Sequence, residues 1–336
     1  MVTERRIIVT IVFMTQPMLA ITTAMQAPEL PLAKELDVVQ ALLCDKRSPN
    51  TRLAYEKDLR DFFRYVAGVA PNPAIVQSFL LLSRFEAMAL VLRYKASLVD
   101  KGLKEATVNR RLAAIKALVN HARKLGLLEW SLAEIKSEKV KPYRDTTGIT
   151  PASFKGMLIA NITDTLKGKR DYALLRLLWD NALRRGEVAL TDLKDLDLEG
   201  RKLWIIGKGR GSQKESVSLS NSTVKALQEW LLARKELNIN QPLFIALDRA
   251  SYGHRLTGTA IYKIVQAAGA KAGISKNSSP HRIRHSGITA ALEATGGDVR
   301  RVQKLSRHAN LNTLMIYDDN RLNHQAEITD LLADLV

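Results

Sequence analysis

Apolar residues recur every three or four positions through most of residues 30–130, the spacing that places them on one face of an α-helix. Ser48-Pro49-Asn50-Thr51 is a helix-start signal, because serine caps a helix and proline suits its first turn. The pattern predicts an all-helical domain over residues 29–140. Its last helix has the clearest apolar stripe, formed by Val108, Leu112, Ile115, Leu118, Val119 and Ala122.

The second half of the chain mixes helices with a little strand. Residues 172–183 are apolar enough to form a largely buried helix. Two predicted strands, residues 202–206 and 215–219, flank the glycine-rich loop Gly207-Lys208-Gly209-Arg210-Gly211. Helical patterns return from residue 223 to the end. The expected fold is therefore mainly α with a small β-hairpin or sheet.

Between the two halves the periodicity fails, and basic residues such as Lys141 gather there. We expect residues 141–149 to be a basic linker able to follow a polyanion. Thr150-Pro151 then restarts a helix, with threonine as the cap and proline in the first turn. The second domain is predicted to span residues 150–336.

The N-terminus loosely resembles a secretory signal, because Arg5-Arg6 precede a short apolar run. That run is far shorter than the ~20 residues that span a bilayer. Met14, Met18 and Met25 offer later start sites. We expect residues 1–28 to be a disordered extension or a product of start-site choice, and the protein to be cytoplasmic with no membrane contact.

The net charge of +17 changes the picture, because it is spread over the whole chain. Basic groups exceed acidic groups by 8 in residues 1–150 and by 9 in residues 151–336. A long polyanion that touches both halves, such as a nucleic acid, would account for this distribution. On charge alone, a merely basic soluble protein explains it equally well.

The single cysteine, Cys44, excludes an internal disulfide and any cysteine-based zinc cluster. Because Cys44 follows an apolar stretch, we expect it to pack in the core. His281 and His285 have the i, i+4 spacing of a zinc pair, but Arg282 replaces the glutamate of the metalloprotease motif. Lys208 fails the P-loop pattern, since glycine follows it between two strands. No metal site is expected.

What remains is a cationic set without carboxylate partners, followed by a tyrosine. Arginines suit the nonbridging oxygens of a phosphodiester, because a guanidinium contacts two oxygens and keeps its charge. A tyrosine, with a pKa of about 10, needs cationic neighbours or a base before it attacks. The candidate residues are Arg184, Lys208, His281, Arg284, His308 and Tyr317.

These residues stand in segments that resemble the tyrosine recombinase (phage integrase) family, including its Xer-like members. The order Arg, Lys, His-x-x-Arg, His, Tyr matches, as does the nine-residue step from His308 to Tyr317. Residues 48–126 resemble the family's N-terminal core-binding, SAM-like helical domain. The resemblance implies that residues 150–336 form a mixed α/β catalytic domain.

The resemblance also implies a role for each candidate. Arg184 and Arg284 would clamp the scissile phosphate, and His308 would donate a hydrogen bond to a nonbridging oxygen. Lys208 would protonate the departing 5′ oxygen, although Lys214 competes for this role. His281 would assist proton transfer while Tyr317 attacks. Glu187, one turn after Arg184, would orient the site.

The implied reaction is site-specific recombination of double-stranded DNA by four protomers on two sites, through a 3′-phosphotyrosine bond and a Holliday junction, without a metal or cofactor. A type IB topoisomerase and a decayed DNA-binding regulator are the alternatives. We expect residues 326–336 to dock on a neighbouring protomer or, alternatively, to pack on their own domain. Candidate DNA contacts are Thr51, Arg52, Arg110, Arg111, Lys141 and Arg210.

Two positions depart from the family pattern. Arg307 stands where many members have glycine before the second histidine. It would either add a phosphate contact or perturb the turn. Asp318-Asp319 follow the nucleophile directly, and their charge would raise its pKa. Either departure would slow the chemistry or mark an inactive copy.

Overall fold

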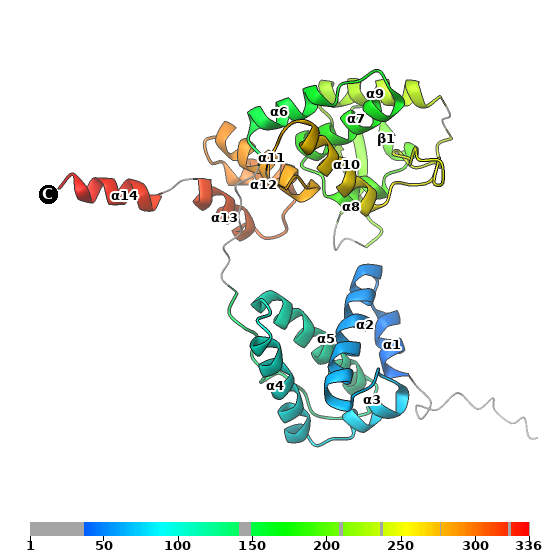
Figure 1. The fold of residues 1–336 in the computed structure, drawn as a ribbon, viewed down its shortest axis with the longest axis vertical. Helices are drawn as coiled ribbons and strands as arrows, with labels where there is room; N and C mark the ends of the chain where they lie inside the picture. The colour runs from blue at the N-terminus through cyan, green and yellow to red at the C-terminus, as the bar shows by residue number, and fades with distance from the viewer. Residues whose placement is uncertain are drawn as a thin grey trace, which may run out of the picture. The chain divides into compact units, whose positions relative to one another are not determined.

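The computed structural model describes residues 37–140, 149–207, 211–235, 238–275, 277–321 and 324–335. The chain divides into two compact units, with the boundary between Val140 and Lys141. The predicted extension 1–28 and the linker residues 141–148 lie outside the described residues. Figure 1 shows the helices of both units and the small sheet of the second.

The described part of the N-terminal unit is built from helices. Their starts follow from local chemistry: Ser48 caps α2 with Pro49 in the first turn, and Ser83 forms a capping box with Glu86 at α4. Aromatic rings then fill the core, with Phe62 edge-on to Tyr94 at 5.3 Å between ring centroids. The helices are α1 (Val38–Asp45), α2 (Pro49–Ala67), α3 (Pro73–Leu80), α4 (Arg84–Asp100) and α5 (Glu105–Lys124).

The C-terminal unit combines helices with a small antiparallel sheet. The sheet has the order β1-β2-β3, and Ile206 at the end of β2 pairs with Lys214 at the start of β3. From the start of the unit to the end of the sheet, the elements are α6 (Pro151–Ala160), α7 (Leu166–Asp180), α8 (Arg185–Leu190), the 3₁₀ turn η2 (Leu193–Asp195), β1 (Leu196–Asp197), β2 (Lys202–Ile206) and β3 (Lys214–Ser218). The remaining helices are α9 (Asn221–Arg234), α10 (Gly258–Lys271), α11 (Pro280–Ala294), α12 (Val299–Ser306), α13 (Asn312–Arg321) and α14 (His324–Ala333).

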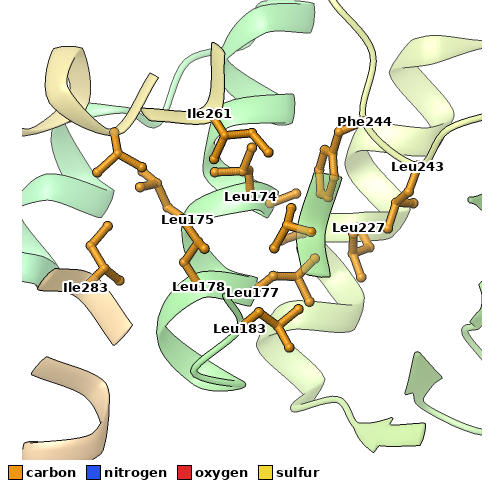
Figure 2. Packing of buried hydrophobic residues seen from close by; sticks show 14 of the residues in the cluster. Leu174, Leu175, Leu177, Leu178, Leu183, Leu227, Leu243, Phe244, Ile261 and Ile283 are labelled. Atoms are coloured by element: carbon orange, nitrogen blue, oxygen red, sulfur yellow. The ribbon is translucent and has the colours of Figure 1, made fainter. Parts of the chain in front are cut away.

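Helix α7 is the centre of this unit's core. Four of its leucines, Leu174, Leu175, Leu177 and Leu178, are fully buried. They point toward α9, α10 and α11, where Leu227, Ile261 and Ile283 meet them (Figure 2). Burying one such side chain contributes about 1.5–3 kcal/mol. The core therefore fixes α11 against α7, and α11 carries two of the candidate site residues, His281 and Arg284.

A smaller apolar cluster fixes α13 against α11 and α12. Ile288 and Leu292 of α11, Val302 of α12 and Leu314 of α13 form it, and Tyr317 belongs to it as well. The candidate nucleophile is thus held by packing rather than left on an exposed tip.

The fold agrees with the expected mainly helical architecture, with two differences. The predicted hairpin gains a third strand, β1, because Leu196 and Asp197 pair with β2. Cys44 is exposed at the end of α1, so the prediction that it packs in the core was wrong. Helix α1 buries its other face, through Val39, Leu42 and Leu43.

Among the described residues, no single helix is long and apolar enough to cross a membrane. By length and composition alone, α3 and α4 meet that test as a pair bent by 115°.

Candidate active site

Helix α11 brings one arginine and two histidines to the same place. Ser279 caps its start, accepting a hydrogen bond from the Arg282 amide at 3.2 Å. His281, Arg284 and His285 then follow at i, i+3 and i+4, so they share one face of the helix. Arg284 and His285 are buried, whereas His281 is exposed.

Arg284 is the deepest cation of the site, with 2% of its surface exposed. Its guanidinium donates to the carbonyl oxygens of Ala182 and Ser306 and lies 3.4 Å from Nε2 of His308. Burial, with the nearby Arg184 charge, lowers its pKa to about 10. The group remains charged near neutral pH, and the part of the shift that comes from Arg184 and Arg307 reflects a cationic surrounding that would favour an anion.

Arg184 stands at the start of α8 and is paired with Glu187. Nη1 of Arg184 lies 2.7 Å from Glu187 Oε1, and the Arg184 amide donates to Oε2 at 2.8 Å. Burial alone would raise the pKa of Glu187, but Arg307 and Arg184 outweigh it and hold that pKa below its ordinary value. Glu187 is therefore a buried carboxylate whose position fixes the guanidinium of Arg184.

Arg307 completes this network from the end of α12. Its Nη2 lies 2.9 Å from Glu187 Oε2, and its Nε lies 3.5 Å from Oε1 of Glu215 on β3. Nη1 also donates to the carbonyls of Asn181 and Leu305, at 3.2 and 2.7 Å. Its backbone has φ +55°, a left-handed conformation that glycine adopts more readily. The departure from the family pattern thus places another cation inside the site.

Tyr317 is 1% exposed and lies beside the histidines. Its phenol hydrogen-bonds with Nδ1 of His285, and its ring centroid is 6.0 Å from that of His308. Nε2 of His285 lies 2.6 Å from Nε2 of His281. His285 is not among the residues predicted for this site, and in the sequence it stands out only as half of a possible zinc pair. Its position one helical turn after His281 was the signal that could have placed it here.

The geometry therefore brings together Arg184, His281, Arg284, His308 and Tyr317, the predicted residues that the structure describes at this site. Lys208, Arg210 and Lys141 lie outside the described residues. The side chains of Asp318 and Asp319 are likewise not described. Within the described ranges, no group of three or more histidine, cysteine, aspartate and glutamate side chains is placed to hold a metal ion.

This arrangement can bind a tetrahedral anion between arginines and present a phenol to it. The family model described as the phage integrase family matches residues 156–324, about half of the chain. The chain belongs to this family. The model of the phage integrase N-terminal SAM-like domain matches residues 39–126, which contain α2 to α5.

Similar proteins extend this assignment along most of the chain. A tyrosine recombinase of Synechocystis sp. is 54% identical over 300 residues, covering 89% of this chain and 96% of the relative. One of Synechococcus elongatus is 52% identical over 303 residues, covering 90% and 95%. The protein is a tyrosine-type site-specific DNA recombinase.

Solved structures show the same fold at low sequence identity. The XerH site-specific recombinase in its post-cleavage complex with difH aligns with a TM-score of 0.59 and 20% identity, covering 91% of this chain and 98% of that one. The Tn1549 transposon integrase in complex with transposon right end DNA aligns with a TM-score of 0.57 and 19% identity, covering 88% and 100%. The predicted fold class, a SAM-like helical domain and a mixed α/β catalytic domain, is confirmed.

The alternative general acid of this recombinase is part of an ion pair. Lys214, the alternative general acid, forms an ion pair with the buried Asp195. To act as the general acid, Lys214 would first have to leave this carboxylate. This contact favours Lys208 over Lys214 as the general acid.

The predicted DNA contacts in the N-terminal unit have partners within that unit. Arg110 pairs with the buried Asp58, and Arg111 pairs with Asp61. Arg52 donates to the carbonyl oxygens of Lys46 and Cys44, and Thr51 lies in the first turn of α2. These contacts give the arginines a structural role, and their contact with DNA remains a prediction. Arg110 still exposes 43% of its side chain.

Proposed function

We propose that this recombinase cleaves duplex DNA by attack of Tyr317, leaving a 3′-phosphotyrosine bond, and exchanges strands through a Holliday junction. The observation that carries the proposal is the convergence of Tyr317, His308 and Arg284. Tyr317 and His308 come from the α12–α13 region, and Arg284 comes from α11, yet their side chains share one buried site.

The phosphate would bind between Arg184 and Arg284. Three guanidinium groups, those of Arg184, Arg284 and Arg307, gather around two described carboxylates: Glu187 pairs with Arg184 and Arg307, and Glu215 pairs with Arg307. The scissile phosphate would supply the missing negative charge. As the phosphorus becomes pentacoordinate, charge builds on its nonbridging oxygens, where preorganised donors stabilise the transition state most. His308 would donate to one of these oxygens.

Proton movement would accompany both bond changes. Attack requires the phenol of Tyr317 to lose its proton, and His281 assists this step. Departure of the 5′ oxygen requires a proton in return, which Lys208 supplies from the loop between β2 and β3. The ester formed with Tyr317 keeps the energy of the broken phosphodiester, so religation needs no cofactor.

The enzyme would act as four protomers on two recombination sites. Support comes from α14, which follows the nucleophile and leaves Ile328, Leu331 and Leu332 exposed by 55%, 61% and 60%. Apolar side chains that remain exposed on one helix are suited to a protein–protein contact. Docking of this helix on a neighbouring protomer would make assembly a condition for activity.

DNA binding would use both units, because both are basic. The proposed contacts are Thr51, Arg52, Arg110, Arg111, Lys141 and Arg210. Since the substrate is chromosomal or mobile duplex DNA, we place the enzyme in the cytoplasm. Fractionation of cells that express the full chain tests this, and recovery outside the cytoplasm would contradict it.

A nicked suicide duplex tests the proposed chemistry. Loss of the short fragment after cleavage prevents religation, so a covalent protein–DNA complex accumulates and survives denaturing electrophoresis. We expect this complex with the wild type, attached at the 3′ side, and none with Tyr317→Phe. DNA binding without any covalent complex in the wild type, on a duplex that carries its recombination site, would contradict the proposal.

A further inference from the structure

His285 lies between the phenol of Tyr317 and His281 and contacts both of them. Tyr317 hydrogen-bonds with Nδ1 of His285, on the same imidazole whose Nε2 lies 2.6 Å from Nε2 of His281. The two imidazole rings meet edge to face, with centroids 3.9 Å apart. His285 is buried and His281 is exposed, so the three groups form a path from the buried phenol to the surface.

We propose that His285 is a catalytic residue that accepts the phenolic proton of Tyr317 and relays a proton to His281. The inference rests on the proposed function of Tyr317 as the nucleophile. It changes the role of His281, which becomes the outer end of a relay rather than the group that touches the phenol.

The relay balances as two proton transfers. Before attack, neutral His285 carries its proton on Nε2, accepts a hydrogen bond from the phenol at Nδ1 and donates to Nε2 of neutral His281. As the phenolic oxygen bonds to phosphorus, its proton moves to Nδ1 of His285, and the Nε2 proton of His285 moves to His281. His281 becomes the imidazolium and returns its proton to solvent. Religation runs the same path backward, because the phenolate of Tyr317 then leaves.

The charges around the phenol suit this direction of transfer. Arg284 of α11 interacts electrostatically with Tyr317, and Arg184 and Arg307 lie close enough to Arg284 to act on its charge. Glu187 opposes them, and His308 lies beside the tyrosine ring. This cationic surrounding favours the phenolate and disfavours an imidazolium trapped at the buried His285. The relay solves that problem by placing the positive charge on the exposed His281.

Single-turnover cleavage of the suicide duplex by four variants tests the relay. His285→Asn keeps an acceptor oxygen near the phenol but cannot take a proton, and His285→Phe removes the acceptor. His281→Gln removes the outer end, and the double variant His281→Gln/His285→Asn joins the two changes. His254→Gln, at an exposed histidine of the same unit, is the matched control. Thermal unfolding and DNA binding are measured for each variant, and if His285→Phe does not fold, the other variants carry the test.

We expect His285→Asn to bind DNA normally and to cleave about 10²–10⁴-fold more slowly near pH 7, the usual contribution of a general base. The deficit should shrink roughly tenfold per pH unit as hydroxide replaces the base. The double variant should be no slower than the slower single variant, because both changes interrupt one path.

A folded His285→Asn that cleaves within about threefold of the wild type would overturn the relay, since loss of a general base slows a reaction by about a hundredfold or more. So would a rate above that of the wild type, which would mean that His285 restrains Tyr317. Single effects that multiply in the double variant would assign the histidines independent roles. If the wild type itself forms no covalent complex, the proposed function fails instead, and the two failures are distinct.

Discussion

Replacing Arg307 by glycine separates two opposing effects at one position. The backbone there has φ +55°, and relieving a left-handed conformation with glycine stabilises by about 1 kcal/mol. Against this, the change removes a guanidinium that contacts Glu187 at 2.9 Å and Glu215 at 3.5 Å. We therefore expect the side-chain contacts of Arg307 to outweigh the strain of its backbone conformation.

The loss is larger than the gain. Breaking a buried ion pair costs about 3–5 kcal/mol, and we take about 3 kcal/mol because Glu187 keeps its two contacts with Arg184. The net destabilisation of Arg307→Gly is then about 2 kcal/mol. For a unit of this size, that lowers Tm by roughly 4–8 °C. Arg307→Ala loses the same contacts without the relief, so it should be about 1 kcal/mol less stable than Arg307→Gly.

Differential scanning calorimetry of the full chain measures both variants. Arg307 lies in the C-terminal unit, so a separate transition of the N-terminal unit serves as an internal control and should not move. An Arg307→Gly variant at least as stable as the wild type would contradict this prediction, because the ion pairs would then contribute no more than the backbone strain that they offset. Equal stabilities of the glycine and alanine variants would show that the backbone conformation carries no strain.

Three further predictions follow from the same site. The pKa of Glu187 is lower in the fold than its ordinary value of 4.5. Its contribution to stability is therefore complete above pH 4.5 and is lost as the pH falls below that value. Glu187→Gln should weaken this acid dependence of the free energy of unfolding, measured by urea titration at several pH values. Lys208→Ala should cleave about 10²–10⁴-fold more slowly on ordinary DNA, yet recover on a duplex with a 5′-bridging sulfur, which leaves without a proton; equal deficits on both would reject Lys208 as the general acid. Removing residues 324–336 should abolish the tetrameric complex in native electrophoresis while preserving binding to one site, and intact tetramers would contradict the docking of α14.

The sequence was sufficient for the elements whose patterns are local. The strand over residues 202–206 was predicted from its place before the glycine-rich loop, and the structure has β2 at Lys202–Ile206. Two neighbouring residues, Leu196 and Asp197, were assigned to no strand, because a pair of residues carries no alternation to detect. Cys44 was misplaced because periodicity alone does not fix which side of a short helix faces the core.

The sequence does not predict which side chains far apart along the chain come into contact. The sequence predicts Arg110 and Arg111 as DNA contacts, but it does not reveal their carboxylate partners, which come from α2, about fifty residues earlier. In the sequence, His285 stands out as a possible metal ligand, and Arg307 stands out as a departure from the family pattern. Their contacts with Tyr317 and Glu187 depend on how α11, α12 and α13 pack, which no spacing rule supplies.

The most direct measurement locates the covalent bond itself. The complex trapped on a suicide duplex is digested with nuclease and trypsin, and the peptides are sequenced by mass spectrometry. Cleavage after Arg307 and Arg321 releases a peptide, residues 308–321, in which Tyr317 is the one tyrosine. We expect a nucleotide joined through its 3′-phosphate to Tyr317 in this peptide. A nucleotide on another residue, or linkage through a 5′-phosphate, would contradict it.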